Sequence, residues 1–119
     1  MKPMKLTIYQ YPNCSTCRKA LKWLDAQSIP YDSVHIVDKP PSQKLLKSAL
    51  TAGVPLKKLF NTSGESYKAG NFKDKLPTMT EAEAIKALAA DGKLIKRPFV
   101  VKGDLVLTGF DEASWKASL

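Results

Sequence analysis

Two cysteines, Cys14 and Cys17, are the residues of this chain whose type and spacing most directly imply chemistry. They lie three positions apart, between a strand-like pattern at residues 5–9 and a helix-like pattern at residues 15–26. At the start of a helix the backbone amides favour a thiolate, and a thiol one turn later can close a disulfide onto it. The pair therefore favours thiol redox chemistry, with Cys14 as the nucleophile and Cys17 as the resolving thiol.

Two other interpretations of the cysteine pair are weaker. A structural zinc site needs four ligands, and His35 is the only other soft ligand in the sequence, so we expect no metal site. Two inert buried thiols would require Cys14 to be buried at an exposed helix start. His35 itself is expected to be an ordinary strand residue and not a catalytic base.

The residues around the pair are expected to bind substrate. The backbone amides of Ser15 and Thr16 belong to the first helical turn, where unpaired N–H groups attract an anion. Asn13 shapes the preceding turn, and Arg18 brings a positive charge directly after Cys17. We expect all four residues to contribute to a substrate site.

The sequence holds a second candidate for anion binding far from the cysteines. Only Arg18 and Arg97 are arginines among the 19 basic residues. The planar guanidinium suits bidentate binding of oxyanions better than an ammonium does. Arg97 is therefore a candidate catalytic residue, against the alternative of a surface strand residue.

The apolar pattern predicts a single α/β domain over residues 1–119. Its predicted strands span 5–9, 31–37, 94–102 with an interruption at Pro98, and 105–108. Its predicted helices span 15–26, 42–52, 55–60, 80–91 and 111–118, and segment 61–75 has no clear assignment. The order is β-α-β, a helical insert at about 42–92, then β-β-α. This is the order of a thioredoxin-like fold with a mixed four-stranded sheet.

That fold gives Arg97-Pro98 a specific expectation. The segment before the third strand of a thioredoxin-like sheet approaches the dithiol, and a cis proline keeps its backbone close. An X-Pro bond is the one peptide bond for which cis is accessible, about 0.5–1 kcal/mol above trans. We therefore predict a cis Arg97-Pro98 bond with Pro98 beside the substrate, against the alternative of a trans proline at a strand start.

Composition limits the class of protein. At 119 residues and 44% hydrophobic content, the chain can bury one core. Its net charge is +8, but the lysines are scattered, which predicts a solvated surface and no direct nucleic-acid contact. We read no secretory leader or membrane span, and a lone cysteine pair suits a reducing cytoplasm. A cytoplasmic monomer is expected.

Three segments carry a resemblance to a known family: residues 9–19 around the cysteines, the Pro40-Pro41-Ser42 turn, and residues 94–101 around Arg97. Together they resemble the glutaredoxin-linked arsenate reductases, a family that includes the Spx-type transcription regulators. The resemblance implies a nucleophile at Cys14 and an oxyanion-binding arginine at Arg97. It implies no bound cofactor, glutathione as a thiol co-substrate, and glutaredoxin or thioredoxin as partners.

Two departures from the enzymes change the expected reaction. The enzymes have two further arginines around the anion, at positions that match Asn61 and Gly109 here, and they usually have one cysteine in the motif. Each lost charge-assisted contact is worth about 1.5–3 kcal/mol. We expect a thiol–disulfide redox protein acting on a small oxidised thiol, without efficient arsenate reduction.

A redox-sensing regulator is the alternative function. The regulators resemble this chain at the 14–19 motif, where a reversible disulfide acts as the switch. The glycine with which they contact the RNA polymerase α subunit matches Gly53. A glycine at this position is also what a helix C-terminus requires, so the match has two explanations.

Overall fold

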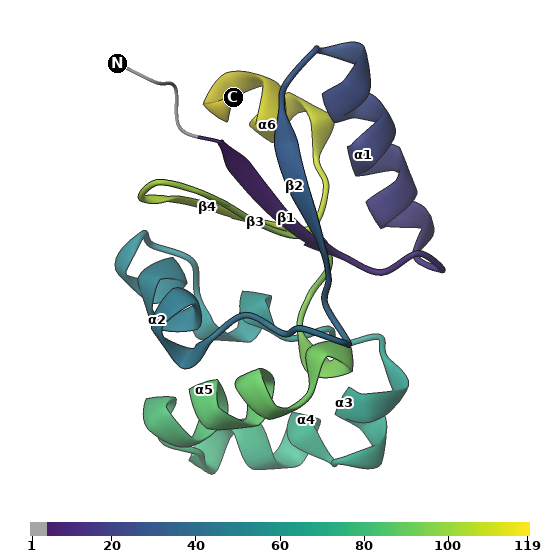
Figure 1. Cartoon of the computed structure of the whole chain (residues 1–119). Helices are drawn as coiled ribbons and strands as arrows, with labels where there is room; N and C mark the ends of the chain where they lie inside the picture. The colour runs from purple at the N-terminus through teal and green to yellow at the C-terminus, as the bar shows by residue number, and fades with distance from the viewer. Residues whose placement is uncertain (1–4) are drawn as a thin grey trace.

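A four-stranded mixed sheet forms the centre of the computed structural model, which describes residues 5–119 (Figure 1). The strands lie in the order β2-β1-β3-β4, with β1 parallel to β2, and β3 antiparallel to both β1 and β4. Their bounds are Leu6–Gln10 for β1, Tyr31–His35 for β2, Phe99–Lys102 for β3 and Leu105–Thr108 for β4. The predicted sheet is therefore confirmed. The leader prediction depended on residues 1–4, which lie outside the described residues.

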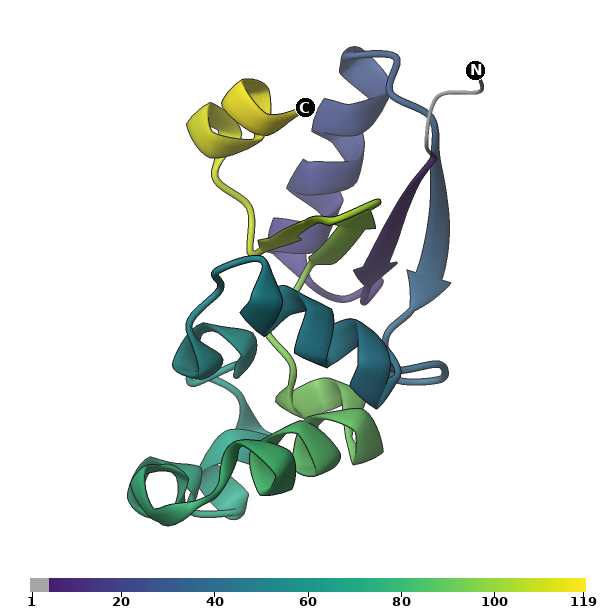
Figure 2. The same ribbon diagram turned by 90° about the vertical axis from the view of Figure 1, so that its left-hand side faces the viewer.

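Helices α1 (Ser15–Ala26) and α6 (Glu112–Ser118) cover one face of the sheet (Figure 2). Side chains alternate between the two faces of a strand, so Leu6 and Ile8 of β1 both point to this face and are fully buried. Trp23 and Trp115 pack edge to face on them, with ring centroids 6.0 Å apart. Both tryptophans are core residues.

The helical insert packs against the opposite face and extends beyond the carboxyl ends of β1 and β2 (Figures 1 and 2). It consists of short elements, which are α2 (Gln43–Thr51), η1 (Leu56–Leu59), α3 (Glu65–Ala69), α4 (Phe72–Lys75), η2 (Leu76–Thr78), α5 (Glu81–Ala90) and η3 (Gly92–Leu94). The segment left unassigned in the sequence thus forms α3 and α4. These helices are too short to persist alone, and the packed rings of Phe60, Tyr67 and Phe72 hold them.

The longer insert helices, α2 and α5, have defined caps. Thr80 and Glu83 form a capping box at the start of α5. Helix α2 begins with Ser42, whose hydroxyl accepts the Leu45 N–H. It ends with Gly53 at φ +100°, where the Gly53 and Val54 N–H groups donate to the Leu50 and Ala49 carbonyls. Gly53 is therefore the helix C-terminal glycine that the sequence predicted.

The predicted strand from residue 94 is wrong before Pro98, because β3 begins only at Phe99. The Asp91 carboxylate accepts the Lys93 N–H and starts a 3₁₀ turn. Ile95 then pairs with Phe60 of the insert instead of entering the sheet. The backbone groups that a longer strand would need are already bonded to the insert.

Candidate active site

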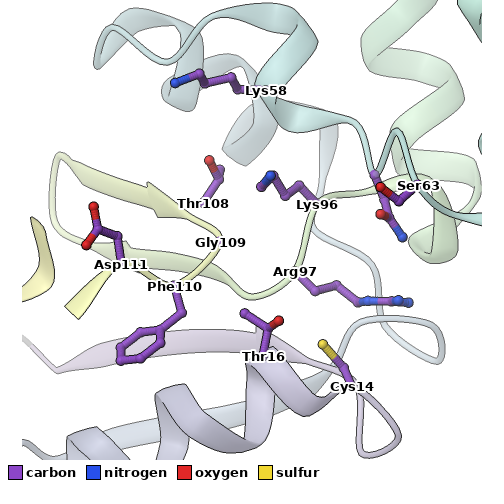
Figure 3. A pocket seen from close by; sticks show the side chains of 11 residues that line it. Cys14, Thr16, Lys58, Ser63, Lys96, Arg97, Thr108, Gly109, Phe110 and Asp111 are labelled. Atoms are coloured by element: carbon purple, nitrogen blue, oxygen red, sulfur yellow. The ribbon is translucent and has the colours of Figure 1, made fainter.

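Cys14 is the N-cap residue of α1, and its side chain faces a cavity (Figure 3). Its backbone is extended, with φ −96° and ψ 115°, and its Sγ accepts the Cys17 N–H at 3.3 Å. The Tyr11 carbonyl accepts the Cys14 N–H at 3.0 Å, which closes the turn through Pro12 and Asn13. A sulfur in this position lies at the positive end of the helix dipole, and a positive potential favours the anionic form of a nucleophile.

Cys17 lies one turn further along α1 and is fully buried. Burial, followed by the hydrogen bond between its side chain and Cys14, raises the pKa of the Cys17 thiol to about 12. Cys17 therefore keeps its proton while Cys14 is exposed to the cavity. Both thiols are free in this structure. The two sulfurs have the unequal environments that a nucleophile and a resolving thiol require.

Arg97 reaches the same place from the segment before β3. The Arg97-Pro98 peptide bond is cis, as predicted. The Arg97 guanidinium lies over the Tyr11 ring, 5.0 Å from its centroid, which is a cation–π distance. Its positive charge also acts to lower the pKa of Cys17, although less strongly than burial raises it. Cys14 and Arg97, which are 83 positions apart in the sequence, thus line the same cavity.

The cavity has two lobes that share Asn61, Ser63 and Arg97. The wide lobe, of about 560 Å³, is lined by Cys14 and Thr16 of α1, by Lys58 of the insert, by Lys96, and by residues 108–111. The narrow lobe, of about 400 Å³, is lined by Tyr11, Asn13, Lys93 and residues 64–66. Figure 3 shows Cys14 and Thr16 on one wall of the wide lobe and Lys58 on the opposite wall. These volumes are in the range of small-ligand sites.

The structure brings together only some of the predicted substrate residues. Thr16 lines the wide lobe and Asn13 the narrow lobe. Ser15 and Arg18 are exposed on α1 and line neither lobe, and Pro98 is buried behind Arg97. Arg18 therefore has no contact with the cavity in this structure.

Both positions at which the resemblance places further arginines do line the wide lobe. Asn61 is a half-buried residue after η1, and Gly109 is buried after β4. Gly109 adopts φ +70°, and a Cβ atom built on it would lie 3.0 Å from the Lys96 Cε atom. The Lys96 side chain thus occupies the space that a larger residue at 109 would need.

The site residues that sequence reasoning missed include Tyr11, Lys58 and Lys96. Tyr11 immediately precedes the proline of the cysteine turn, and Lys96 immediately precedes Arg97, so proximity to the motifs was an available signal for both. Lys58 carried no such signal. It reaches the lobe only because η1 packs beside the segment before β3, where the Leu59 carbonyl accepts the Lys96 N–H at 2.8 Å.

His35 lies at the end of β2, outside both lobes. Its Nδ1 accepts the Val37 and Asp38 N–H groups at 3.3 and 3.2 Å, and its ring packs on Tyr11 with centroids 5.4 Å apart. Among residues 5–119, no group of three or more His, Cys, Asp or Glu side chains could hold a metal ion. Within the same residues, no helix is long and apolar enough to span a membrane.

A comparison with the profiles of known protein families identifies the family of this chain. The profile of the ArsC family covers residues 9–118. This chain belongs to the ArsC family. A solved ArsC-family related protein from Bacteroides fragilis is 49% identical and superimposes with a TM-score of 0.92, covering 98% of both chains. A possible arsenate reductase from Streptococcus mutans is 42% identical, with a TM-score of 0.90, and covers 98% of this chain and 99% of its own. The thioredoxin-like fold is thereby confirmed.

Curated ArsC relatives of this chain have more than one described role. An uncharacterised protein, YusI, from Bacillus subtilis is 48% identical over 110 residues, covering 92% of this chain and 93% of its own. The regulatory protein MgsR from the same organism is 30% identical, covering 90% and 84%. An arsenate reductase from Haemophilus influenzae is 31% identical, covering 89% and 91%. The relatives of this chain thus include both a reductase and a regulator.

Proposed function

We propose that this ArsC-family chain is a thiol–disulfide oxidoreductase that reduces a small oxidised thiol. The observation that carries the proposal is the contrast between the two sulfurs. Cys14 caps α1 and faces the cavity, whereas Cys17 is buried behind it with a raised pKa. A nucleophile must be reachable and stabilised as a thiolate, and a resolving thiol must stay protonated until the mixed disulfide has formed.

The reaction proceeds in two displacements at sulfur. The Cys14 thiolate attacks one sulfur of a disulfide, so that a Cys14–substrate disulfide forms and the other substrate thiolate leaves. Cys17 then attacks Cys14 Sγ and its proton passes to the departing sulfur, which forms the Cys14–Cys17 disulfide and releases the second half of the substrate as a thiol. The substrate gains two electrons and the protein dithiol loses two. An external thiol such as glutathione, or a glutaredoxin or thioredoxin, would return the protein to its reduced state.

Trapping the mixed disulfide tests this reaction. The Cys17→Ser variant should accumulate one substrate thiol on Cys14, seen by intact-mass spectrometry, and release one thiol. The reduced parent protein should release two thiols and finish as the internal disulfide. The Cys14→Ser variant, in which Cys17 remains buried, is the matched control and should form no adduct. An adduct on Cys17 at the same rate would contradict the proposal.

Arsenate is a poor substrate on the same geometry. Asn61 and Gly109 leave Arg97 as the one arginine lining the wide lobe in the described part of the chain. Losing two charge-assisted contacts of about 1.5–3 kcal/mol each predicts at least about 100-fold slower arsenate turnover than an enzyme that has them. A coupled assay with glutathione and glutaredoxin measures this turnover, and turnover equal to that of the Haemophilus influenzae reductase would contradict the expectation.

A regulator that binds the RNA polymerase α subunit is the second candidate, favoured by the exposed position of Gly53. A Cβ atom on Gly53 would meet no atom within 4 Å, so this surface is open to a partner. However, the C-terminal bonds of α2 already account for the glycine. Capture of the α subunit that is lost in Gly53→Arg, but kept in Gly53→Ala, would favour the regulator. Both variants place a Cβ at the same φ, so only the long cation differs.

A further inference from the structure

Three cations line the wide lobe together with Cys14. They are Lys58, Lys96 and Arg97, and each comes from the side of the lobe that lies away from α1 (Figure 3). The one ion pair of a lysine or arginine within residues 5–119 is Lys5–Asp32, so no cation of the lobe has an anionic partner in that range. Positive charges gathered at one cavity without partners attract an anion to it.

The single carboxylate of the wide lobe is already engaged. Asp111 is the N-cap residue of α6, where its carboxylate accepts the Ala113 N–H at 3.2 Å and the Ser114 hydroxyl at 3.0 Å. It therefore contacts α6 and not the lysines. The charge that the lobe offers to a ligand is positive.

Lys96 is an exposed residue whose side chain lies over Gly109 at the lobe. Its Cε and Cδ atoms lie 3.0 and 3.9 Å from the position of a Cβ atom on Gly109, so its stem lies across that glycine. The absence of a side chain at 109 is what makes room for it. Figure 3 shows the Lys96 side chain among those that line the lobe together with Cys14.

We propose that Lys96 and Lys58 form a specificity site for the anionic group of a small acidic thiol, so that the preferred substrates are disulfides whose leaving or bound thiol carries a carboxylate. The inference rests on the proposed function and adds the class of thiol. Cys14 would take the sulfur, and the two lysines would hold the carboxylate on the opposite side of the lobe. Lysine ammonium groups act as point charges, so they suit a flexible chain with a terminal carboxylate.

A series of three disulfides that differ in charge tests the proposal: dithiodipropionate is anionic, hydroxyethyl disulfide is neutral and cystamine is cationic. The rate of mixed-disulfide formation on Cys14 is measured by intact mass, with Cys17→Ser as the parent protein. Lys96→Met and Lys58→Met, each added to that parent, remove one charge and keep most of the stem. Comparing each variant with the parent for the same probe removes differences in intrinsic reactivity between probes.

Each lysine variant should slow the anionic probe by roughly fivefold, as expected for an exposed charge–charge contact, and leave the neutral probe unchanged. The cationic probe should react faster. Lys57→Met is the matched control, because Lys57 is the neighbour of Lys58 but lines a separate cavity with Leu56 and Tyr67. It should change none of the three rates.

Two results would overturn the charge preference and leave the proposed function intact. One is an equal loss of rate for all three probes, which would mean that the lysines affect Cys14 or the fold. The other is an anionic rate that neither lysine variant changes. A parent protein that forms an adduct with none of the probes would overturn the proposed function, and the preference with it.

Discussion

Cys14 and Cys17 share one helix turn but meet opposite surroundings. Cys14 lines the wide lobe at the start of α1, and Cys17 has no exposed surface. Residues three positions apart lie on the same face of a helix, so the difference is one of depth. Cys14 lies at the open end of α1, and Cys17 lies one turn further in, where the protein core covers it. Two predictions follow from it.

Alkylation should separate the two thiols in the native, reduced protein. Iodoacetamide should modify Cys14 near neutral pH and leave Cys17 unmodified, because Cys17 is buried and its raised pKa keeps it protonated. Peptide mass spectrometry after brief labelling measures both sites. The same reagent in denaturant, where both thiols should react, is the control. Equal labelling of the native protein would show that Cys17 is accessible.

The raised pKa of Cys17 also predicts a loss of stability in alkali. The folded protein holds the Cys17 proton up to about pH 12, whereas the unfolded chain releases it near the free-thiol value of about 8.5. The unfolded state therefore binds fewer protons above that value, and stability falls as the pH rises. Urea unfolding of the reduced protein between about pH 8 and about pH 10 measures the fall.

Cys17→Ala is the control for the alkaline effect. It should be less stable at neutral pH, because it loses a buried sulfur, but its stability should decline less over the same range. The window ends near pH 10 because Tyr9 and Tyr31, whose pKa values are also raised by burial, begin to titrate above it. If the stability of Cys17→Ala fell with pH as steeply as that of the parent protein, groups other than Cys17 would cause the loss.

At the scale of elements, the site depends on how the insert is joined to the sheet. Gly92 of η3 lies against the chain that leaves β2, and a Cβ atom on it would collide with the Ile36 carbonyl and lie 2.9 Å from Val37 Cα. The segment that follows η3 carries Lys96 and Arg97 into the cavity. This close backbone contact therefore sets the position of the arginine relative to β1 and β2.

Two glycine-to-alanine changes should have unequal costs. Gly53→Ala meets open space, so its cost is the positive φ alone, about 1–2 kcal/mol. Gly92→Ala must move backbone, so its cost should reach about 3 kcal/mol or more. Urea unfolding measures both, and Cys14 alkylation should slow only in Gly92→Ala. A Gly53→Ala variant that is the less stable of the two would contradict this account of the insert.

At the scale of the whole molecule, the cavity lies between the sheet with α1 and the helical insert, which are separate parts of the sequence. The sheet with α1 contributes the sulfur, and the insert with the segment before β3 contributes the cations. The net charge of +8 places this cavity in a molecule that attracts anions at long range. Salt should therefore affect the reaction with anionic disulfides.

Raising the ionic strength from roughly 0.01 M to roughly 1 M shortens the screening length from about 30 Å to about 3 Å. The adduct rate of Cys14 with dithiodipropionate should fall over this range, and the rate with hydroxyethyl disulfide should stay nearly constant. Stopped-flow or quenched mass measurements at several salt concentrations give both rates. An equal response of the two probes would show that long-range charge has no role.

Local patterns in the sequence were enough for most of the architecture. Some features depend only on neighbouring residues, so they can be recognised without knowing the fold. They are the cysteine spacing, the capping box at Thr80 and the C-terminal glycine of α2. The cis bond at Pro98 was predictable because the order of elements indicated a fold in which it is expected. The strand predicted from residue 94 was wrong because the hydrogen-bond partners of residues 94–96 belong to the insert, which lies far away in the sequence.

The charge of the cavity depends on contacts between segments that are remote in the chain. Which cations face Cys14 is set by the packing of η1 beside the segment before β3 and by the lack of a side chain at Gly109. Neither contact leaves a periodic signal, because each joins single residues from loops. Residue types and their spacing thus predicted a thiol redox protein, and three-dimensional packing revealed which of its 19 basic residues lie where a substrate would bind.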